Sequence, residues 1–456
     1  MACPSLLRIA CAGAALSLSC FVSCAHAQAV PAGEPAIGDA CAGVAGADWR
    51  PVTGKVDAPP PAAPRPPKGR PLRDAVFGTC VVRATQHGAE PPRGFARADY
   101  SRRQSFNADG SRFLVVDGNG SWHLYDAATL APLGALKGVS GDAEPHWHPD
   151  DPGLLYYLPR NGVGMRLHEL DVRSGRSRIA ADFGDRIRKL WPAAASAWTR
   201  SEGSPSADLR YWAFLVDGGD WKGLGLFTYD LRTDTIVATY DLAANGRPRP
   251  DHLSMSPTGE FVVVSWDDGP QAFTREFGQP RRLAGRGEHS DIALDADGDD
   301  VYVSVDYQAS GGPVYMTHLR TGQRTRLFDS YVSSTATAMH FSGKAYRSPG
   351  WVVVSTYADH AGGGRLRRAL GGGGFQWLHR KVFAVELSDA PRIVNLAFHH
   401  STPAGYFTEP HASANRDLTR VLFNSNWGAS GDRDVDAYLV VLPGPLPPAR
   451  RRDSSR

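Results

Sequence analysis

The sequence predicts an all-β protein that folds as a seven-bladed β-propeller closed by an N-terminal strand. Three observations support this. The folded part repeats one unit: a short strand, a turn rich in Asp, Asn, Pro and Gly, a β-branched strand, an alternating strand that ends in Asp, and a last strand. No amphipathic helical pattern separates the units, which argues against a βαβ fold. An extra strand precedes the first full unit and can complete the last one.

The units follow one another along the chain, each marked by its most β-branched or most regularly alternating strands. These strands are 113–116 and 122–126, 154–158 and 167–171, 211–216 and 226–230, 261–266, 301–305, 351–356 and 382–387, and 421–424 and 437–441. The last unit runs out of chain before its fourth strand. Strand 80–84 can supply that strand, so we expect it to pair near Tyr438 and remove an exposed sheet edge.

The composition excludes several classes of protein. With 42% hydrophobic residues and a formal net charge of +3, the chain is neither disordered nor a nucleic-acid binder. A length of 456 residues would ordinarily suggest several domains, but the repeat makes most of the chain one unit.

The N-terminus has the pattern of an export signal. Arg8 precedes an apolar stretch over 9–22, and Ala25-His26-Ala27 is a small-residue cleavage site, so residues 1–27 are predicted to be a secretory signal peptide. The alternative is lipidation at Cys24. No other stretch approaches the ~20 apolar residues that span a bilayer. We therefore expect a periplasmic or secreted protein with no transmembrane segment in its mature chain.

Composition also predicts the boundaries of the folded part. Residues 28–72 form an N-terminal arm whose Pro-rich stretch 57–71 is expected to be extended and unpacked, 73–444 form the propeller, and 445–456 form a disordered tail. Within the propeller, 361–379 is a basic insertion flanked by glycines. It is either a lid over an anionic ligand or a surface loop without a function.

Two cysteines, Cys41 and Cys80, remain once the signal peptide is removed. In an oxidising compartment two cysteines are expected to pair, which would tether the arm to the propeller. The alternative is that both thiols stay free, because spacing alone does not show that they lie within bonding range.

Candidate chemistry lies where the innermost strands begin, because these positions converge on the axis of a propeller. Four units place an acid within two residues of a histidine: Glu144 with His146, Asp251 with His252, Glu288 with His289, and Glu409 with His411. Imidazoles and carboxylates together suit a divalent metal or proton transfer. The competing interpretation is that each histidine only bonds to the neighbouring blade.

Three of these segments resemble oligogalacturonate lyases, which are seven-bladed propellers. The segments are Asp251-His252-Leu253-Ser254-Met255-Ser256-Pro257-Thr258, Glu288-His289 ahead of Asp297-Gly298, and Pro410-His411-Ala412-Ser413. The resemblance implies β-elimination of uronic-acid oligosaccharides, with His252 as base and Asp251 orienting it. It also implies a divalent ion of the manganese or calcium class, held by His289 and His411. From their positions at the starts of inner strands, Glu409 and His146 are further candidate ligands.

The match to that family has two departures. Glu409 replaces the first of the family's paired histidines, and no residue matches its glutamine ligand. The Ser-Pro turns are also similar to those of TolB-like propellers.

Other polar and aromatic residues are candidates for contacting a sugar. Arg160 and Arg249 would neutralise acidic groups, and Trp266, Tyr357 and Trp427 would stack on sugar rings. Each has an alternative role, as a solvated loop charge for the arginines and as packing between blades for the aromatics.

Two functions therefore compete. The first is a lyase that cleaves acidic oligosaccharides. The second is a non-catalytic, TolB-like propeller that binds a glycan or an envelope protein. The sequence lacks the Gly-x-Ser-x-Gly elbow of a propeller-associated peptidase.

Overall fold

The computed structural model describes residues 36–46, 48–361, 375–429 and 431–452, with side chains left undescribed at 359–361. The predicted signal peptide and Cys24 lie outside these ranges, as does the insertion except at its ends. In the described part, no helix combines the length and apolar character needed to cross a membrane. The helices there are α1 (Ile37–Ala45), α2 (Gly184–Arg188) and the 3-10 turn η1 (Tyr406–Thr408).

The described residues form an all-β fold of small antiparallel sheets. Four of the sheets are β10-β9-β8-β7, β11-β12-β13-β14, β15-β16-β17-β18 and β19-β20-β21-β22. Their strands are β7 (His146–Trp147), β8 (Leu154–Tyr157), β9 (Arg166–Asp171), β10 (Arg176–Asp182), β11 (Ala194–Trp198), β12 (Tyr211–Gly218), β13 (Gly223–Asp230), β14 (Thr235–Asp241), β15 (His252–Met255), β16 (Phe261–Ser265), β17 (Gln271–Thr274), β18 (Arg281–Arg282), β19 (Ser290–Leu294), β20 (Asp300–Val305), β21 (Pro313–His318) and β22 (Arg324–Asp329).

A five-stranded sheet has the order β23-β24-β25-β26-β27, and a nine-stranded sheet contains both ends of the repeat. The five are β23 (Tyr331–Val332), β24 (Thr335–Ser342), β25 (Trp351–Ala361), β26 (Lys381–Glu386) and β27 (Ile393–Phe398). The nine are β1 (Leu72–Arg73), β2 (Cys80–Arg83), β3 (Ala96–Arg97), β4 (Arg112–Asp117), β5 (Ser121–Asp126), β6 (Pro132–Ser140), β28 (Ser413–Ala414), β29 (Arg420–Ser425) and β30 (Asp436–Val441).

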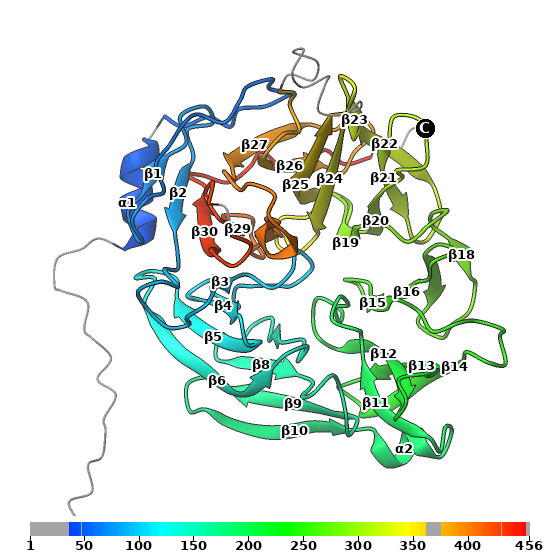
Figure 1. Ribbon diagram of the computed structural model, residues 1–456. Helices are drawn as coiled ribbons and strands as arrows, with labels where there is room; N and C mark the ends of the chain where they lie inside the picture. The colour runs from blue at the N-terminus through cyan, green and yellow to red at the C-terminus, as the bar shows by residue number, and fades with distance from the viewer. Residues whose placement is uncertain (1–35, 47, 362–374, 430, 453–456) are drawn as a thin grey trace, which may run out of the picture. The chain divides into compact units, whose positions relative to one another are not determined.

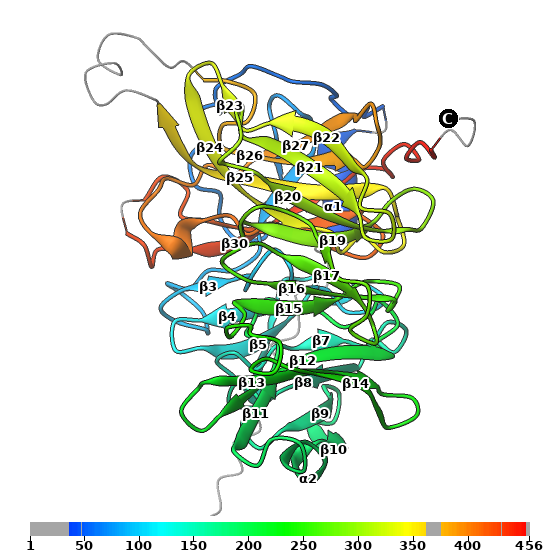
Figure 2. The ribbon, with the colours of Figure 1, turned by 90° about the vertical axis from the view of Figure 1, so that its right-hand side faces the viewer.

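Within Pro35–Arg456 the sheets succeed one another around a common centre (Figure 1). The side view shows them stacked one beside the next, from β24–β27 through β19–β22 and β15–β18 to β11–β14 (Figure 2). The core lies in layers between successive sheets. Phe183, Phe214 and Phe227, for example, pack in one buried cluster between the β7–β10 and β11–β14 sheets. Strands buried on both faces explain why the sequence shows β-branched runs at each unit.

The early strand pairs where the repeat predicts. Strand β2 lies antiparallel to β30, with Val81 opposite Val440 and Val82 opposite Leu439. The Cys41–Cys80 disulfide joins α1 to this strand, with the two Cα atoms 5.4 Å apart. The arm is therefore tied covalently to the strand that extends the last unit.

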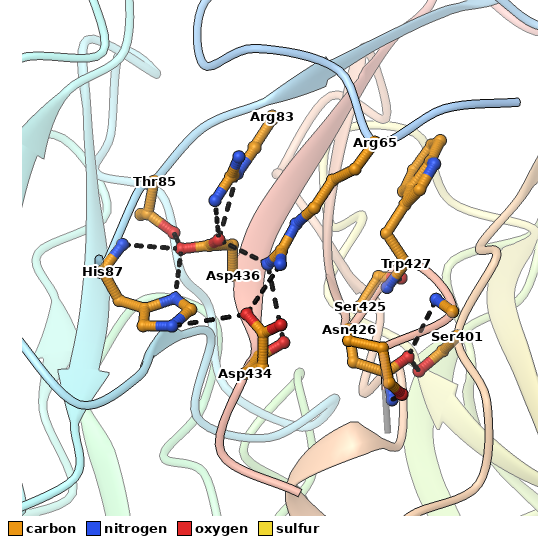
Figure 3. Close-up of polar contacts among 12 residues, drawn as sticks. Arg65, Arg83, Thr85, His87, Ser401, Ser425, Asn426, Trp427, Asp434 and Asp436 are labelled. Atoms are coloured by element: carbon orange, nitrogen blue, oxygen red, sulfur yellow. Dashed lines mark hydrogen bonds and ion pairs between the residues drawn. The ribbon is translucent and has the colours of Figure 1, made fainter. Parts of the chain in front are cut away.

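The described parts of the arm and of the tail are packed, which corrects the expectation of an unpacked linker and, over 445–452, of a disordered tail. Arg65 of the Pro-rich stretch pairs with Asp434 at 2.6 Å and with Asp436 at 2.6 Å (Figure 3). In the tail, the Arg450 guanidinium lies 2.6 Å from the buried carboxylate of Glu386. Buried carboxylates form ion pairs with both segments. The composition did not predict this, because it does not show which charged residues the fold brings together.

Candidate functional site

Two groups of ionisable side chains gather where the inner strands of the sheets begin. His252 is the first residue of β15, and His289 immediately precedes β19. His340 lies within β24, and Glu409 and His411 lie between η1 and β28. We call His289, His340, Glu409 and His411 the histidine cluster, and Arg102, Glu202, Asp251 and His252 the His252 group.

The rings of the histidine cluster lie against one another. The centroid of the His340 ring is 4.4 Å from that of His289 and 4.2 Å from that of His411. The Glu409 carboxylate lies 2.7 Å from Nε2 of His340 and 3.6 Å from Nε2 of His411. On the other side, the Tyr357 hydroxyl lies 3.0 Å from Nδ1 of His289. Side chains from three different sheets therefore meet at one place.

Several buried ring nitrogens of this cluster have no hydrogen-bond partner. They are Nδ1 of His340 and both nitrogens of His411, whose residues are 1% and 0% exposed. Buried polar atoms are nearly always bonded, so these nitrogens are available to a ligand. One ligand atom each from His340, Glu409 and His411 fall within 4.8 Å of one another, which suits a metal ion. Imidazoles fit a transition-metal dication better than calcium, which takes oxygen ligands.

The electrostatics favour neutral imidazoles in this cluster. Burial, reinforced by nearby positive charge, lowers the pKa of His289 and of His340 to about 3, and burial lowers the pKa of His411 well below its usual value. Burial raises the pKa of Glu409 to about 7. Neutral rings keep a lone pair available, which is the form that binds a metal.

The His252 group has the geometry of an oriented base. Nδ1 of His252 lies 3.2 Å from the Asp251 carboxylate, and its Nε2 faces the Arg102 guanidinium. The Asp251 carboxylate, hydrogen-bonded to His252, has its pKa lowered to about 2. An ionised carboxylate on one ring nitrogen places the lone pair on the other, which is how a histidine base is commonly oriented.

One segment links the two groups. Residues 98–105, between β3 and β4, are nearly all buried, and Tyr100 within them packs on His340 and His411 with ring centroids 5.3 Å and 4.9 Å apart. Two residues on, Arg102 reaches His252 and also donates to the Ser290 hydroxyl at 3.2 Å. Ser290 follows His289 directly. The histidine cluster and the His252 group are therefore neighbours.

The structure does not bring His146 into either group. Its Nε2 accepts a hydrogen bond from Arg103 at 3.1 Å, and its ring meets the edge of Trp212. The adjacent acid, Glu144, accepts hydrogen bonds from the backbone N–H groups of Thr199 and Ser201. The predicted metal role of His146 is therefore corrected to a packing role, because an arginine occupies the nitrogen a metal would need.

Of the predicted substrate contacts, only Tyr357 lies at the histidine cluster, where its ring stacks on His340. Arg160 is exposed in the turn that follows β8. Arg249 makes two 2.7 Å hydrogen bonds to the buried carboxylate of Asp217. That ion pair satisfies the guanidinium, which corrects its expected substrate role.

The two predicted tryptophans are packing residues. Trp266 is 1% exposed and donates from Nε1 to the Pro248 carbonyl. Trp427 is stacked between His400 and Tyr438, and its Nε1 donates to the Ala63 carbonyl of the arm. Figure 3 shows Trp427 close to Ser425, Asn426 and Arg65. Neither ring offers a free face to a sugar, so both predictions are corrected.

Sequence reasoning missed His340, Tyr100, Arg102 and Glu202. His340 lacks the acidic neighbour that marked the other histidines, and it lies inside a strand lengthened at its start by a hairpin with β23. The strand register could have identified His340, because His340 pairs with Ser355 in the same way that His252 pairs with Ser265. Arg102 and Glu202 lie in segments without a repeat pattern.

Sheets arranged about a centre, with histidines and carboxylates on their inner strands, define a β-propeller with a candidate metal site. No family model and no curated protein matches the sequence. Among solved structures, oligogalacturonate lyase in complex with manganese matches with a TM-score of 0.55 at 17% identity, over 82% of this chain and 96% of that one. An oligogalacturonate lyase from Vibrio parahaemolyticus matches with a TM-score of 0.55 at 14% identity, again over 82% and 96%. The predicted resemblance is confirmed at the level of the fold.

Proposed function

We propose that this protein is a metal-dependent lyase that cleaves uronic-acid oligosaccharides by β-elimination. The observation that carries the proposal is that the segment with Tyr100 and Arg102 brings a cluster of imidazoles with unpartnered nitrogens beside a histidine oriented by a carboxylate. β-Elimination beside a carboxylate needs a base for the α proton and positive charge for the anion that develops. The two groups supply these two requirements.

His340, Glu409 and His411, with His289 beside them, are the residues that would hold the ion. A dication of the manganese class, when bound there, would neutralise the substrate carboxylate and acidify the adjacent carbon. Nε2 of His252 takes the proton from that carbon, and Asp251 stabilises the imidazolium that forms. The electron pair of the broken C–H bond forms a carbon–carbon double bond as the glycosidic C–O bond breaks. The departing oxygen takes a proton from water.

The test is an ultraviolet assay, because elimination leaves a conjugated double bond in the product. Purified protein, stripped of metal and then supplied with Mn²⁺, is incubated with pectic, alginate-like and glycosaminoglycan oligosaccharides. We expect absorbance to rise with at least one of them, and only with metal. No rise with any of them would overturn the lyase, and the TolB-like role of binding a glycan or an envelope protein would replace it.

We also propose that the sheets count as seven blades. The nine-stranded sheet divides where β3 meets β30 through a single pair of residues, Ala96 and Asp436. On this count β3–β6 are the first blade, and β28–β30 with β2 are the last, so β2 closes the ring. An experimental structure with a different number of sheets around the axis would contradict the count.

Export is part of the proposal, with the protein acting in the periplasm or outside the cell. The Cys41–Cys80 disulfide supports an oxidising compartment, since such bonds are rare in the cytosol. Fractionation of cells producing the full chain tests it. We expect protein shortened at its N-terminus in the periplasm or medium, and full-length protein in the cytosol would contradict the export signal.

A further inference from the structure

Arg102 is a buried cation whose polar partners all contact its two Nη atoms, while its Nε has none. The residue is 5% exposed; its guanidinium forms an ion pair with the Glu202 carboxylate at 2.8 Å and donates a hydrogen bond to the Ser290 hydroxyl at 3.2 Å. Its Nη1 also faces Nε2 of His252. Glu202, Asp251 and His252 would by themselves suit a metal ion, but the guanidinium already supplies their positive charge.

Glu202 reaches this place on a tightly built turn. Arg200 and Ser201 both have positive φ, 59° and 71°, although neither is glycine. The N–H of Ser201 donates to the buried Glu144 carboxylate at 2.6 Å, which holds the turn in place. At Gly203 a Cβ would lie 2.0 Å from the Leu253 carbonyl, so only glycine fits there. Non-glycine residues in this conformation cost free energy, and they persist where the surrounding structure enforces them.

The Glu202 side chain keeps contact with solvent even though its partner is buried. It is 32% exposed, against 6% for the Arg102 side chain. A carboxylate on the solvent side of a buried guanidinium lies where the carboxylate of an entering ligand would bind, because arginine binds carboxylates through paired N–H groups.

We propose that Arg102 is the carboxylate receptor of this site, and that Glu202 occupies it until a uronate carboxylate takes its place. This inference rests on the proposed function for its substrate class. While Glu202 holds the guanidinium, the Nη1 hydrogen of Arg102 points at the lone pair of His252. An entering carboxylate that accepts two hydrogens from the guanidinium withdraws that hydrogen and leaves Nε2 of His252 free. Anion binding and release of the base are then one event.

Binding is measured by calorimetry with saturated trigalacturonate in the presence of a chelator, so that neither metal nor turnover contributes. Glu202→Gln removes the competing charge, and we expect roughly 10-fold tighter binding than in wild type. Arg102→Gln removes the receptor, and we expect roughly 10- to 100-fold weaker binding. The methyl-esterified trimer, which lacks the charges, is expected to bind the wild type and Glu202→Gln equally.

Two matched controls separate this effect from general changes in charge. Arg210→Gln takes a guanidinium from the buried Asp230, and Glu260→Gln takes a carboxylate from Arg320, both outside the site. Neither is expected to change binding by more than roughly twofold. Circular dichroism shows whether Arg102→Gln is folded. If it is not folded, trigalacturonate binding by Glu202→Gln alone tests the inference.

Unchanged or weaker binding of trigalacturonate by Glu202→Gln would overturn the inference. A failure of both wild type and Glu202→Gln to bind trigalacturonate would overturn it as well. The ultraviolet assay separates this from the proposed function. Binding that follows the expected order without any absorbance rise means that the receptor stands and the lyase fails. If absorbance rises but trigalacturonate binds wild type and Glu202→Gln equally, the lyase stands and the carboxylate receptor fails.

Discussion

Two buried polar regions of this protein contrast in how completely their atoms are bonded. Around Asp436, which we call the arm cluster, every side chain has a partner: Arg65 and Arg83 each lie 2.6 Å from one carboxylate oxygen, and Thr85 and His87 bond the other (Figure 3). In the histidine cluster, both nitrogens of His411 and one of His340 have none.

The difference separates a structural role from a functional one. Buried charges that are fully paired hold a fold in one arrangement, and the arm cluster fixes the N-terminal arm to the last strand. Buried nitrogens without partners cost stability, and a ligand bound at the histidine cluster would relieve that cost. Both regions bury histidine beside a carboxylate, but the carboxylate of the arm cluster is paired with two guanidinium groups, whereas the histidine cluster keeps ring nitrogens without a hydrogen bond.

The largest expected effect is on the base. His252→Gln should lower turnover in the ultraviolet assay roughly 10²–10⁴-fold, because a glutamine side chain cannot accept the α proton. His87→Gln, in the arm cluster, changes the same residue type and should leave turnover unchanged. Equal losses in the two variants would mean that the contrast between the regions is wrong.

Next in size is the loss of the charge at the centre of the arm cluster. Asp436→Asn leaves Arg65 and Arg83 facing an amide, and the free energy of unfolding should fall by about 3 kcal/mol. Asp434→Asn, whose side chain is 42% exposed, should cost less than about 1 kcal/mol. Chemical denaturation measures both, and metal binding should be unaffected in either.

Metal binding should stabilise the histidine cluster by mass action. At a free Mn²⁺ concentration of 100 times Kd, the gain is about 2.7 kcal/mol and appears as a higher melting temperature. His340→Ala and His411→Ala should melt at the same temperature with and without metal, whereas His168→Ala on β9 should keep the full response. A response that survives in His340→Ala would exclude this residue as a ligand.

The smallest effect contrasts Asp436 with Asp300, a buried carboxylate that accepts hydrogen bonds from Thr258 and has no ion-pair partner among the described residues. Burial raises the pKa of Asp300 to about 6, whereas Arg83 and His87 outweigh burial and lower the pKa of Asp436. A raised pKa means that the folded state holds the proton more tightly, so stability should fall as pH rises from about 4 to 6.

Asp300→Asn keeps an acceptor for Thr258 but cannot ionise, so it should remove that decline. The variant should be more stable than wild type at pH 7 by roughly 1–3 kcal/mol and equal to it at low pH. Asp436 contributes the opposite slope, with stability lost as pH falls through its lowered pKa. Denaturation curves across pH 4–7 that are parallel for wild type and Asp300→Asn would contradict this.

The sequence by itself determined the central strands of most units, the order of the repeat and the pairing of β2 with β30. These follow from local patterns: β-branched runs, Asp-Gly turns and a last unit one strand short. It also pointed to His252, His289 and His411, since each stands within two residues of an acid at the start of an inner strand.

Only the tertiary structure decided which of those residues meet, and with what. His340 has no acidic neighbour in the sequence that would single it out. Arg102 and Glu202, which pair, lie one hundred residues apart in the chain. His146 is hydrogen-bonded to an arginine 43 positions away. Burial likewise gives Trp266 and Trp427 packing roles, and the hydrogen bond to Asp217 occupies the Arg249 guanidinium. Strand patterns depend on neighbours in sequence, whereas the bonding of a buried nitrogen depends on whatever the fold brings within 3 Å, roughly the length of one hydrogen bond.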